Sequence, residues 1–195
     1  MVKAIIFDCF GVLTTDGWLP FKKRYFGSNP KLFEEAGRIN VLADSGKISG
    51  LEFVAQVAEL ANVSTDQARR EMTSNIVNSE LFDYIATKIA PNYDVGMLSN
   101  ASENFLDSLF THEQLSVFTA ISLSCDTGYV KPDEQAYNSI VSSLGVSIDE
   151  CIFIDDQPRY IEGAKDIGLE SILYKDLDSM ITELDNILEM TNTDK

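Results

Sequence analysis

The sequence predicts an α/β protein, a parallel β-sheet with helices on both faces, and three observations predict this class. Residues 2–7 form a short apolar run broken at Gly11, which indicates a buried strand that opens into a loop. Residues 18–90 have apolar side chains at helical spacing. After Pro91 the pattern alternates between strands and helices, which is typical of a parallel sheet covered on both faces.

The helical block contains no convincing strand. One predicted helix starts at STDQ, residues 64–67, whose Ser and Gln have the spacing of a capping box. Another carries its apolar positions on one face: Leu51, Val54, Ala55, Ala58 and Ala61.

The remaining strands and helices alternate to the end of the chain. The strands are predicted at DVGMLS (94–99), FTAISLS (118–124), CIFI (151–154) and SILY (171–174). The helices are predicted at 102–110, 133–144, 159–167 and 178–190. Because the first strand belongs to the same sheet, the helical block is an insertion, and we expect a core of residues 1–15 and 88–195 with an all-helical unit of residues 16–87.

Charge and composition limit the partners. The chain has 195 residues, 45% of them hydrophobic, which is enough for one core and a small second lobe. With 15 basic and 31 acidic residues, the net charge is −16, which disfavours nucleic acid and anionic membranes. An anionic substrate therefore requires local positive groups or a metal ion.

The cysteines and the N-terminal segment indicate a cytoplasmic protein. Cys9, Cys125 and Cys151 are an odd set without a disulfide pattern, which suits a reducing compartment. No basic start precedes a long apolar segment, and no stretch approaches membrane-spanning length, so we expect neither a leader nor a membrane anchor. The oligomeric state is not readable from these features.

Polar residues follow the predicted strands at their carboxyl ends, where open parallel sheets bind ligands. Asp8 follows the first strand, Ser99 ends the second, Lys131 follows the third, and Asp155 with Asp156 ends the fourth. Each alone reads as a helix cap or a turn residue. Capping does not explain why a lysine and three carboxylates share one edge, so the set predicts a functional site.

These residue types suit phosphoryl transfer. Three carboxylates near one point need a cation, and hard oxygen ligands favour Mg²⁺. The Ser99 hydroxyl, the Lys131 ammonium and backbone N–H groups near Ser102 are suited to hold phosphoryl oxygens. Asp8 then remains as a nucleophile that forms an acyl phosphate, which water hydrolyses.

Four ordered segments resemble the motifs of the haloacid dehalogenase (HAD) superfamily: DCFGVL, LSN, KPD and FIDDQPRYIEGA. The resemblance covers essentially the whole chain and implies a HAD-like modified Rossmann core with an inserted helical cap. It implies Asp8 as nucleophile, Ser99 and Lys131 as phosphate ligands with Asn100 beside them, and a small phosphorylated molecule as substrate. It also implies a Mg²⁺ site formed by Asp8, the backbone carbonyl of Phe10, Asp155 and Asp156.

Phe10 departs from the pattern of the family's phosphatases. They usually carry a second aspartate there as the acid and base, a role worth roughly 10²–10⁴ in rate that a phenyl ring cannot fill. The 2-haloacid dehalogenases also have an aromatic residue there, because halide leaves without a proton, but they usually lack the paired acids that this chain keeps as Asp155 and Asp156. Tyr160 is a second departure, since relatives often have asparagine there.

Three functions therefore remain open: a Mg²⁺-dependent phosphatase that is slow or uses another acid, a dehalogenase-like hydrolase, and a protein that binds its ligand without turnover. Asp16 is the nearest replacement acid in sequence, followed by Tyr160, Cys9 and His112. Each of these four also has a purely structural interpretation.

The helical insertion is expected to select the substrate. The run from Lys22 to Arg24 is suited either to attract an anion or to form a solvated face. Arg159 follows the metal acids and either contacts substrate or is solvent-exposed. Lys47 has the position of a turn that opens a helix. The aromatic residues near the start of the insertion indicate either a pocket wall or a core: Trp18, Phe21, Tyr25 and Phe26.

Overall fold

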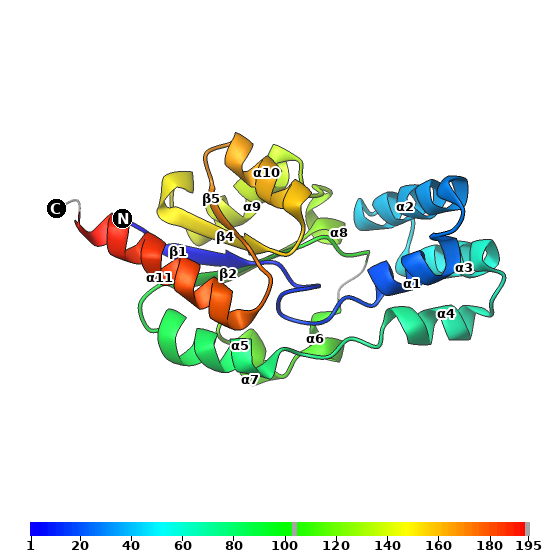
Figure 1. Ribbon diagram of the computed structural model, residues 1–195, viewed down its shortest axis with the longest axis horizontal. Helices are drawn as coiled ribbons and strands as arrows, with labels where there is room; N and C mark the ends of the chain where they lie inside the picture. The colour runs from blue at the N-terminus through cyan, green and yellow to red at the C-terminus, as the bar shows by residue number, and fades with distance from the viewer. Residues whose placement is uncertain (103–104, 194–195) are drawn as a thin grey trace.

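The structure is a computed structural model that describes residues 1–102 and 105–193, and it contains a five-stranded sheet in the order β3-β2-β1-β4-β5 (Figure 1). Every pair of neighbouring strands is parallel. This confirms the predicted α/β class. The strands are β1 (Ala4–Phe7), β2 (Asp94–Ser99), β3 (Ala120–Leu123), β4 (Cys151–Asp155) and β5 (Glu170–Leu173).

The central strand β1 fixes the position of the sheet edge. Phe7 pairs with Met97 of β2 on one side and with Ile154 of β4 on the other. All four β1 residues are buried, as expected of a strand covered on both faces. The residues that follow β1, β2 and β4 therefore emerge at one edge of the sheet.

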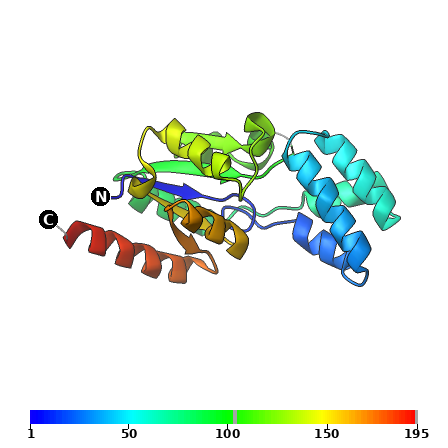
Figure 2. The same cartoon turned by 90° about the horizontal axis from the view of Figure 1, so that it is seen from above.

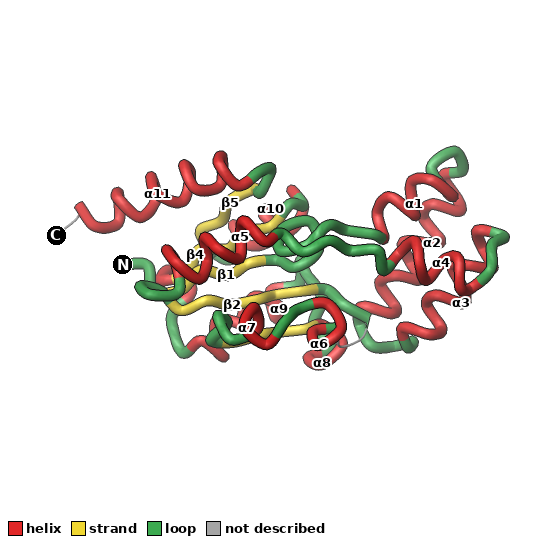
Figure 3. Tube along the Cα trace, turned by 90° about the horizontal axis from the view of Figure 1, so that it is seen from below, coloured by secondary structure: helices red, strands yellow, loops and turns green. Residues whose placement is uncertain are grey.

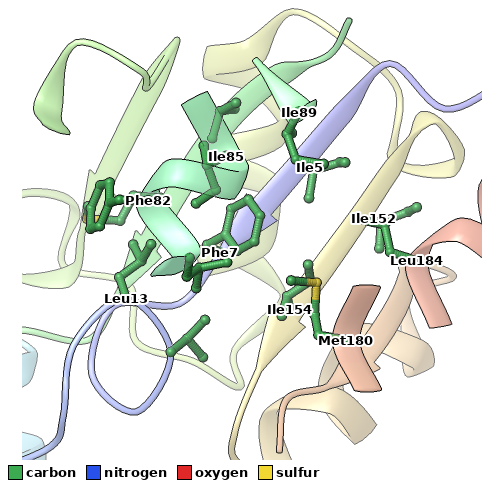
Figure 4. Packing of buried hydrophobic residues seen from close by; sticks show 14 of the residues in the cluster. Ile5, Phe7, Leu13, Phe82, Ile85, Ile89, Ile152, Ile154, Met180 and Leu184 are labelled. Carbon is green, nitrogen blue, oxygen red and sulfur yellow. The ribbon is translucent and has the colours of Figure 1, made fainter. Parts of the chain in front are cut away.

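One face of the sheet is covered by α5 (Ser79–Tyr84), the π-helical turn η1 (Ile85–Ile89) and α11 (Leu177–Thr193) (Figure 3). Figure 4 shows this packing from close by, with side chains of β1 and β4 against those of the helices. The labelled residues are Ile5, Phe7, Leu13, Phe82, Ile85, Ile89, Ile152, Ile154, Met180 and Leu184.

The other face is covered by α9 (Glu134–Leu144) and α10 (Pro158–Asp166). Tyr137 and Ile140 of α9 and Ile161 of α10 pack on Ile6 and Phe153 of the sheet. The helices predicted at 133–144, 159–167 and 178–190 are thus present, and none of their ends differs by more than three residues.

The predicted helix 102–110 is shorter in the structure. The described part is α6 (Leu106–Leu109), residues 103–104 lying outside the described residues. Phe110 has extended backbone angles, and Thr111 starts a new capping box with Gln114 that opens α7 (His112–Leu115). The prediction also missed two other short elements, α8 (Ser124–Thr127) and the 3₁₀ turn η2 (Ile148–Glu150).

A separate group of four helices lies beyond the carboxyl ends of the strands (Figures 1 and 2). These are α1 (Trp18–Phe26), α2 (Pro30–Asp44), α3 (Gly50–Ala61) and α4 (Thr65–Met72), which share their own hydrophobic cluster. We call this group the cap.

Two predictions within the cap were wrong in detail. The buried face of α3 consists of Phe53, Val54, Val57 and Ala58, whereas Leu51 is 63% exposed and Ala55 is exposed as well. The prediction thus had Val54 and Ala58 right, but missed the large side chains Phe53 and Val57 of the buried stripe. At α4, Ser64 caps the helix, but the Gln67 side chain bonds Tyr25 and Glu71, so only half of the capping box forms.

The division into residues 1–15 with 88–195 and residues 16–87 remains a prediction. Within the second range, Leu81, Phe82 and Ile85 pack in the cluster of the sheet and not in that of the cap. Across the described residues, no helix is both long enough and apolar enough to cross a membrane.

Candidate active site

A buried lysine joins two of the predicted strand-end carboxylates. Lys131, in the loop between α8 and α9, places its Nζ 2.6 Å from Oδ1 of Asp8 and 2.6 Å from Oδ2 of Asp155. All three are nearly inaccessible, with 2%, 5% and 0% of their surface exposed, respectively. The structure thus brings together the residue after β1, a residue of the loop after α8 and the last residue of β4, as the sequence predicted for this edge.

Three carboxyl groups surround this point. One oxygen of each of Asp8, Asp155 and Asp156 lies within 4.8 Å of the others. Burial first, and then the charge of Asp155, raises the pKa of Asp8 to about 8, although Lys131 opposes this. Burial lowers the pKa of Lys131, but the charges of Asp155 and Asp8 more than offset it and raise that pKa overall. Lys131 is therefore a charged ammonium beside three carboxyl groups.

The carboxyl groups fit a hard divalent cation. Asp156 Oδ1 is buried and has no hydrogen-bond partner among the described residues. Burial, and then the charge of Asp155, raises the pKa of Asp156. A cation bound by oxygen ligands supplies the missing partner and offsets the repulsion, as Mg²⁺ does in all-oxygen sites.

Gly11 allows Asp156 to approach the loop after β1. Its φ is +100°, which a residue with a side chain rarely adopts. A Cβ at this position would lie 2.5 Å from Cγ of Asp156 and 2.6 Å from Oδ2. Glycine is thus needed both for the backbone angle and for the position of the carboxyl group.

The two residues predicted at the end of β2 differ in surroundings. Ser99 is fully buried, and its Oγ has no partner among the described residues. Asn100 accepts a hydrogen bond from Lys131 N at 2.8 Å and donates to Lys131 O at 3.1 Å. Asn100 therefore positions the lysine loop, and the substrate-binding roles of Ser99 and Asn100 remain predictions.

Tyr160 braces the same loop from α10. Its hydroxyl accepts hydrogen bonds from Asn100 at 3.2 Å and from Arg159 at 2.5 Å. Its ring lies under the ammonium of Lys131, 4.9 Å from Nζ to the centroid, a cation–π distance. Burial raises the pKa of Tyr160. The tyrosine at this position thus has a structural role that its departure from the family pattern did not suggest.

A cavity of about 390 Å³ opens above Asp8 and Lys131, lined by residues of both the cap and the core. This volume is within the range of small-molecule sites. Phe10 lines it, with its ring 4.8 Å from that of Phe105. The cap supplies both apolar and polar lining, including Trp18, Phe53, Lys22, Asn40 and Asp44.

The sequence model of the haloacid dehalogenase-like hydrolase family matches residues 2–168 of this chain. The chain belongs to this family. Its motif residues Asp8, Lys131 and Asp155 meet at the carboxyl edge of the sheet, on the side of the cap (Figure 1). The match includes the whole cap as well as β1 to β4.

Relatives of this HAD hydrolase include enzymes with different names. A phosphatase of Mycobacterium tuberculosis is 27% identical over 88% of this chain and 87% of its own. Bifunctional epoxide hydrolase 2 of Sus scrofa is 22% identical over 95% of this chain but only 39% of its own. The chain thus spans less than half the length of the second relative.

Solved HAD structures share the fold. A HAD family enzyme of Bacteroides thetaiotaomicron, in complex with magnesium and inorganic phosphate, has a TM-score of 0.70 at 23% identity, covering 90% of this chain and 95% of that one. A 2-haloacid dehalogenase of Pseudomonas syringae has a TM-score of 0.60 at 18% identity, covering 91% of this chain and 90% of that one.

The structure separates the candidates for a replacement acid in this HAD hydrolase. Asp16 lines the cavity, but its two oxygens accept hydrogen bonds from the backbone N–H groups of Trp18 and Leu19, so it caps α1. His112 is exposed at the start of α7 and is absent from the cavity lining. Cys9 is buried, and burial raises its pKa.

Asp44 is a cavity residue that sequence reasoning missed. It is the last residue of α2, only 8% exposed, and its Oδ2 accepts a hydrogen bond from Asn40 at 2.7 Å. Burial raises the pKa of Asp44 to about 7. Its spacing from Asn40 is ordinary for a helix surface, so only the position of α2 against the core reveals it.

Asp44→Asn is expected to stabilise the protein, and more so as the pH rises from 5 to 8. The native state holds the Asp44 proton up to about pH 7, while the unfolded chain releases it near its ordinary pKa, so stability falls with rising pH across that interval. The variant removes this penalty, on the order of 2–4 kcal/mol at pH 8 and less at pH 5. Urea unfolding at both pH values measures it. The exposed Asp185→Asn is the control, and an equal change in the two variants would contradict the prediction.

The other cap residues considered from sequence have mixed positions. Lys47 is exposed and absent from the cavity lining. Phe21 and Phe26 are buried in the cap cluster, and Trp18 and Tyr25 pack against it. Trp18 also lines the cavity, and the Tyr25 hydroxyl donates a hydrogen bond to Glu71. The aromatic set is thus mostly core with one residue in the cavity wall.

Proposed function

We propose that this HAD hydrolase is a Mg²⁺-dependent phosphatase that acts on a small phosphorylated metabolite. The observation that carries the proposal is the group of Asp8, Asp155 and Asp156 within 4.8 Å of one another, with Lys131 bonded to two of them. Paired acids beside the nucleophile suit phosphoryl transfer, since halide displacement needs no metal.

Asp8 is the nucleophile in this proposal. Its carboxylate attacks phosphorus, the bond from phosphorus to the alcohol oxygen breaks, and an acyl phosphate forms on Asp8. Water then attacks phosphorus, releases inorganic phosphate and restores the carboxylate. Lys131, fixed by Asp155, offsets the negative charge that both steps bring to the site.

Asp8, Asp155, Asp156 and the backbone carbonyl of Phe10 are the residues that would hold Mg²⁺. When bound, the ion neutralises phosphoryl charge and polarises the oxygens. The Ser99 hydroxyl, buried at the end of β2 and without a partner among the described residues, would donate a hydrogen bond to a phosphoryl oxygen.

With Phe10 in place of an acid, the rate of hydrolysis is expected to depend on whether the leaving group needs a proton. No carboxyl stands two residues after Asp8, so the wild-type enzyme is expected to cleave p-nitrophenyl phosphate well and alkyl phosphates poorly, because an aryl oxide leaves without a proton. Phe10→Asp is expected to raise kcat for an alkyl phosphate by about 10²-fold or more and to change aryl turnover little. Steady-state hydrolysis of both substrates with Mg²⁺ and with chelator measures this.

The control for this variant is Phe105→Leu, which removes the ring that contacts Phe10 without adding an acid. An equal gain for both substrates in Phe10→Asp would contradict the missing-acid explanation. Absence of turnover of either phosphate by folded wild-type protein would overturn the proposed function. A 2-haloacid would then be the substrate to test, since an aromatic residue at position 10 also suits halide displacement.

The cellular setting and the partners of the reaction are also proposed from the sequence. We expect a cytoplasmic enzyme, and the three cysteines are free thiols in the structure. The substrate is a small molecule, since the cavity of about 390 Å³ has the size for one. Nucleic acid and anionic membranes stay disfavoured by the charge of −16.

A further inference from the structure

We propose that Lys22 and Arg159 form a second anion-binding subsite in the cavity, so that the substrate carries an anionic group on its leaving-group side as well as the phosphoryl group at Asp8. The inference rests on the proposed phosphatase function and names its substrate class. That class is phosphate monoesters of an alcohol that bears a carboxylate or a second phosphate.

The two cations line the same cavity from different parts of the chain. Lys22 belongs to α1 of the cap and Arg159 to α10 of the core. Neither takes part in an ion pair with any residue that the structure describes. Most lysines and arginines that the structure describes form no ion pair either, so what distinguishes these two is that both line one cavity.

The Lys22 side chain packs against α2 of the cap. Its Nζ is 4.0 Å from the centroid of the Phe33 ring on α2. Gly37, in the middle of the same helix, leaves room for it, because a Cβ there would lie 2.8 Å from Nζ. Glycine inside a helix lowers helix stability relative to alanine, so the space has a cost that packing alone does not explain.

Arg159 is exposed at the cavity, and its contacts with Tyr160 orient it. Its guanidinium carbon lies 4.4 Å from the centroid of the Tyr160 ring, and Nη2 donates a hydrogen bond to the Tyr160 hydroxyl at 2.5 Å. This leaves the other guanidinium nitrogens for a ligand. A planar guanidinium binds carboxylate and phosphate oxygens in pairs.

The two cations repel each other in the absence of an anion. Burial, followed by the charge of Arg159, lowers the pKa of Lys22. Of the two cap carboxyls of the cavity, Asp44 accepts a hydrogen bond from Asn40 and Asp16 accepts from backbone N–H groups, and neither forms an ion pair with Lys22 or Arg159. The nearby charge of Arg159 opposes the burial that raises the pKa of Asp44. An anionic group of the substrate is therefore the partner that this part of the cavity lacks.

The first test measures binding, which does not depend on turnover. Isothermal titration of Asp8→Asn with Mg²⁺ compares 2-phosphoglycolate, ethylene glycol bisphosphate and the neutral 2-hydroxyethyl phosphate. The proposal predicts a Kd at least about tenfold lower for one or both of the acidic ligands. Tighter binding of 2-phosphoglycolate identifies a carboxylate as the second group of the substrate, and tighter binding of ethylene glycol bisphosphate identifies a phosphate. Equal Kd values for all three, or no binding of any, would overturn the proposal.

The second test places the subsite. Lys22→Met and Arg159→Met are expected to raise the Kd for the tighter acidic ligand about tenfold and to leave that for 2-hydroxyethyl phosphate unchanged, while the exposed Lys23→Met changes neither. Gly37→Ala is expected to keep or raise the melting temperature, because alanine stabilises a helix relative to glycine. It is also expected to weaken binding of the acidic ligand, because the new methyl group displaces Nζ of Lys22. A Lys22→Met variant that binds the acidic ligands like wild type would overturn the assignment.

Failure of this inference is distinguishable from failure of the proposed function. Hydrolysis of p-nitrophenyl phosphate by the wild-type protein depends on Asp8 and the metal acids and needs no second anion. Turnover of that substrate together with equal Kd values for the three ligands would reject the subsite alone. A Kd preference without any turnover would keep the subsite and reject the phosphatase.

Discussion

Asp8→Asn is expected to lower kcat for p-nitrophenyl phosphate by about 10⁴-fold or more. The amide has nearly the shape of the carboxylate but is a far weaker nucleophile, so the acyl phosphate does not form. The variant keeps Lys131 bonded to Asp155, because that contact does not involve Asp8. Steady-state hydrolysis with saturating Mg²⁺ measures the loss.

The folding of Asp8→Asn must be compared in the same preparation. A circular dichroism spectrum and urea midpoint near those of wild type separate chemistry from collapse of the fold. Turnover within tenfold of wild type would mean that another residue attacks phosphorus or that water attacks it directly. Either result would reject Asp8 as the nucleophile.

Lys131→Met is expected to destabilise the protein by about 3–5 kcal/mol in metal-free buffer at pH 8, the usual cost of leaving buried charges without a partner. Lys131 is the ammonium bonded to both Asp8 and Asp155, and it is 2% exposed. Without it, the carboxyls must either stay charged in a buried site or take up protons. Urea unfolding measures the free energy change.

The pH dependence of this variant follows from the same contacts. Removing Lys131 takes away the group that opposes the raised pKa of Asp8, so the native state holds protons to a higher pH than before. The wild type releases the Asp8 proton near pH 8 and the variant releases it at a higher pH, so the loss of stability grows as the pH rises from 7 to 9. Lys175→Met, at an exposed lysine, is the matched control. A loss below about 1 kcal/mol at pH 8 would show that the buried ion pairs contribute little.

The sheet was predictable because its strands are distinct apolar runs that alternate with helices. Its polar edge was predictable because polar residues follow those runs. A parallel sheet brings the carboxyl ends of its strands together, so Asp8, Ser99 and Asp155 had to emerge at one edge. Lys131 needed one further assumption, that its loop returns to the same edge. The structure places its Nζ 2.6 Å from both carboxylates.

The cap was less predictable because its residues meet the core across long sequence separations. Nothing local distinguishes Asp44, at the end of α2, from a surface acid, and its burial depends on where that helix meets the core. Lys22 and Arg159 were ambiguous from sequence alone, because a cation on a helix face is usually solvated. Their shared cavity is a property of the tertiary structure.

The most direct measurement is acid-quench trapping of the reaction with a reactive aryl phosphate and Mg²⁺, followed by peptide mass spectrometry. The predicted result is one phosphoryl group on the peptide that contains Asp8, present in wild type and absent in Asp8→Asn. Treatment with hydroxylamine removes it, as expected of an acyl phosphate. Full turnover by wild type with no phosphoryl group on Asp8 at any quench time would contradict the proposed chemistry.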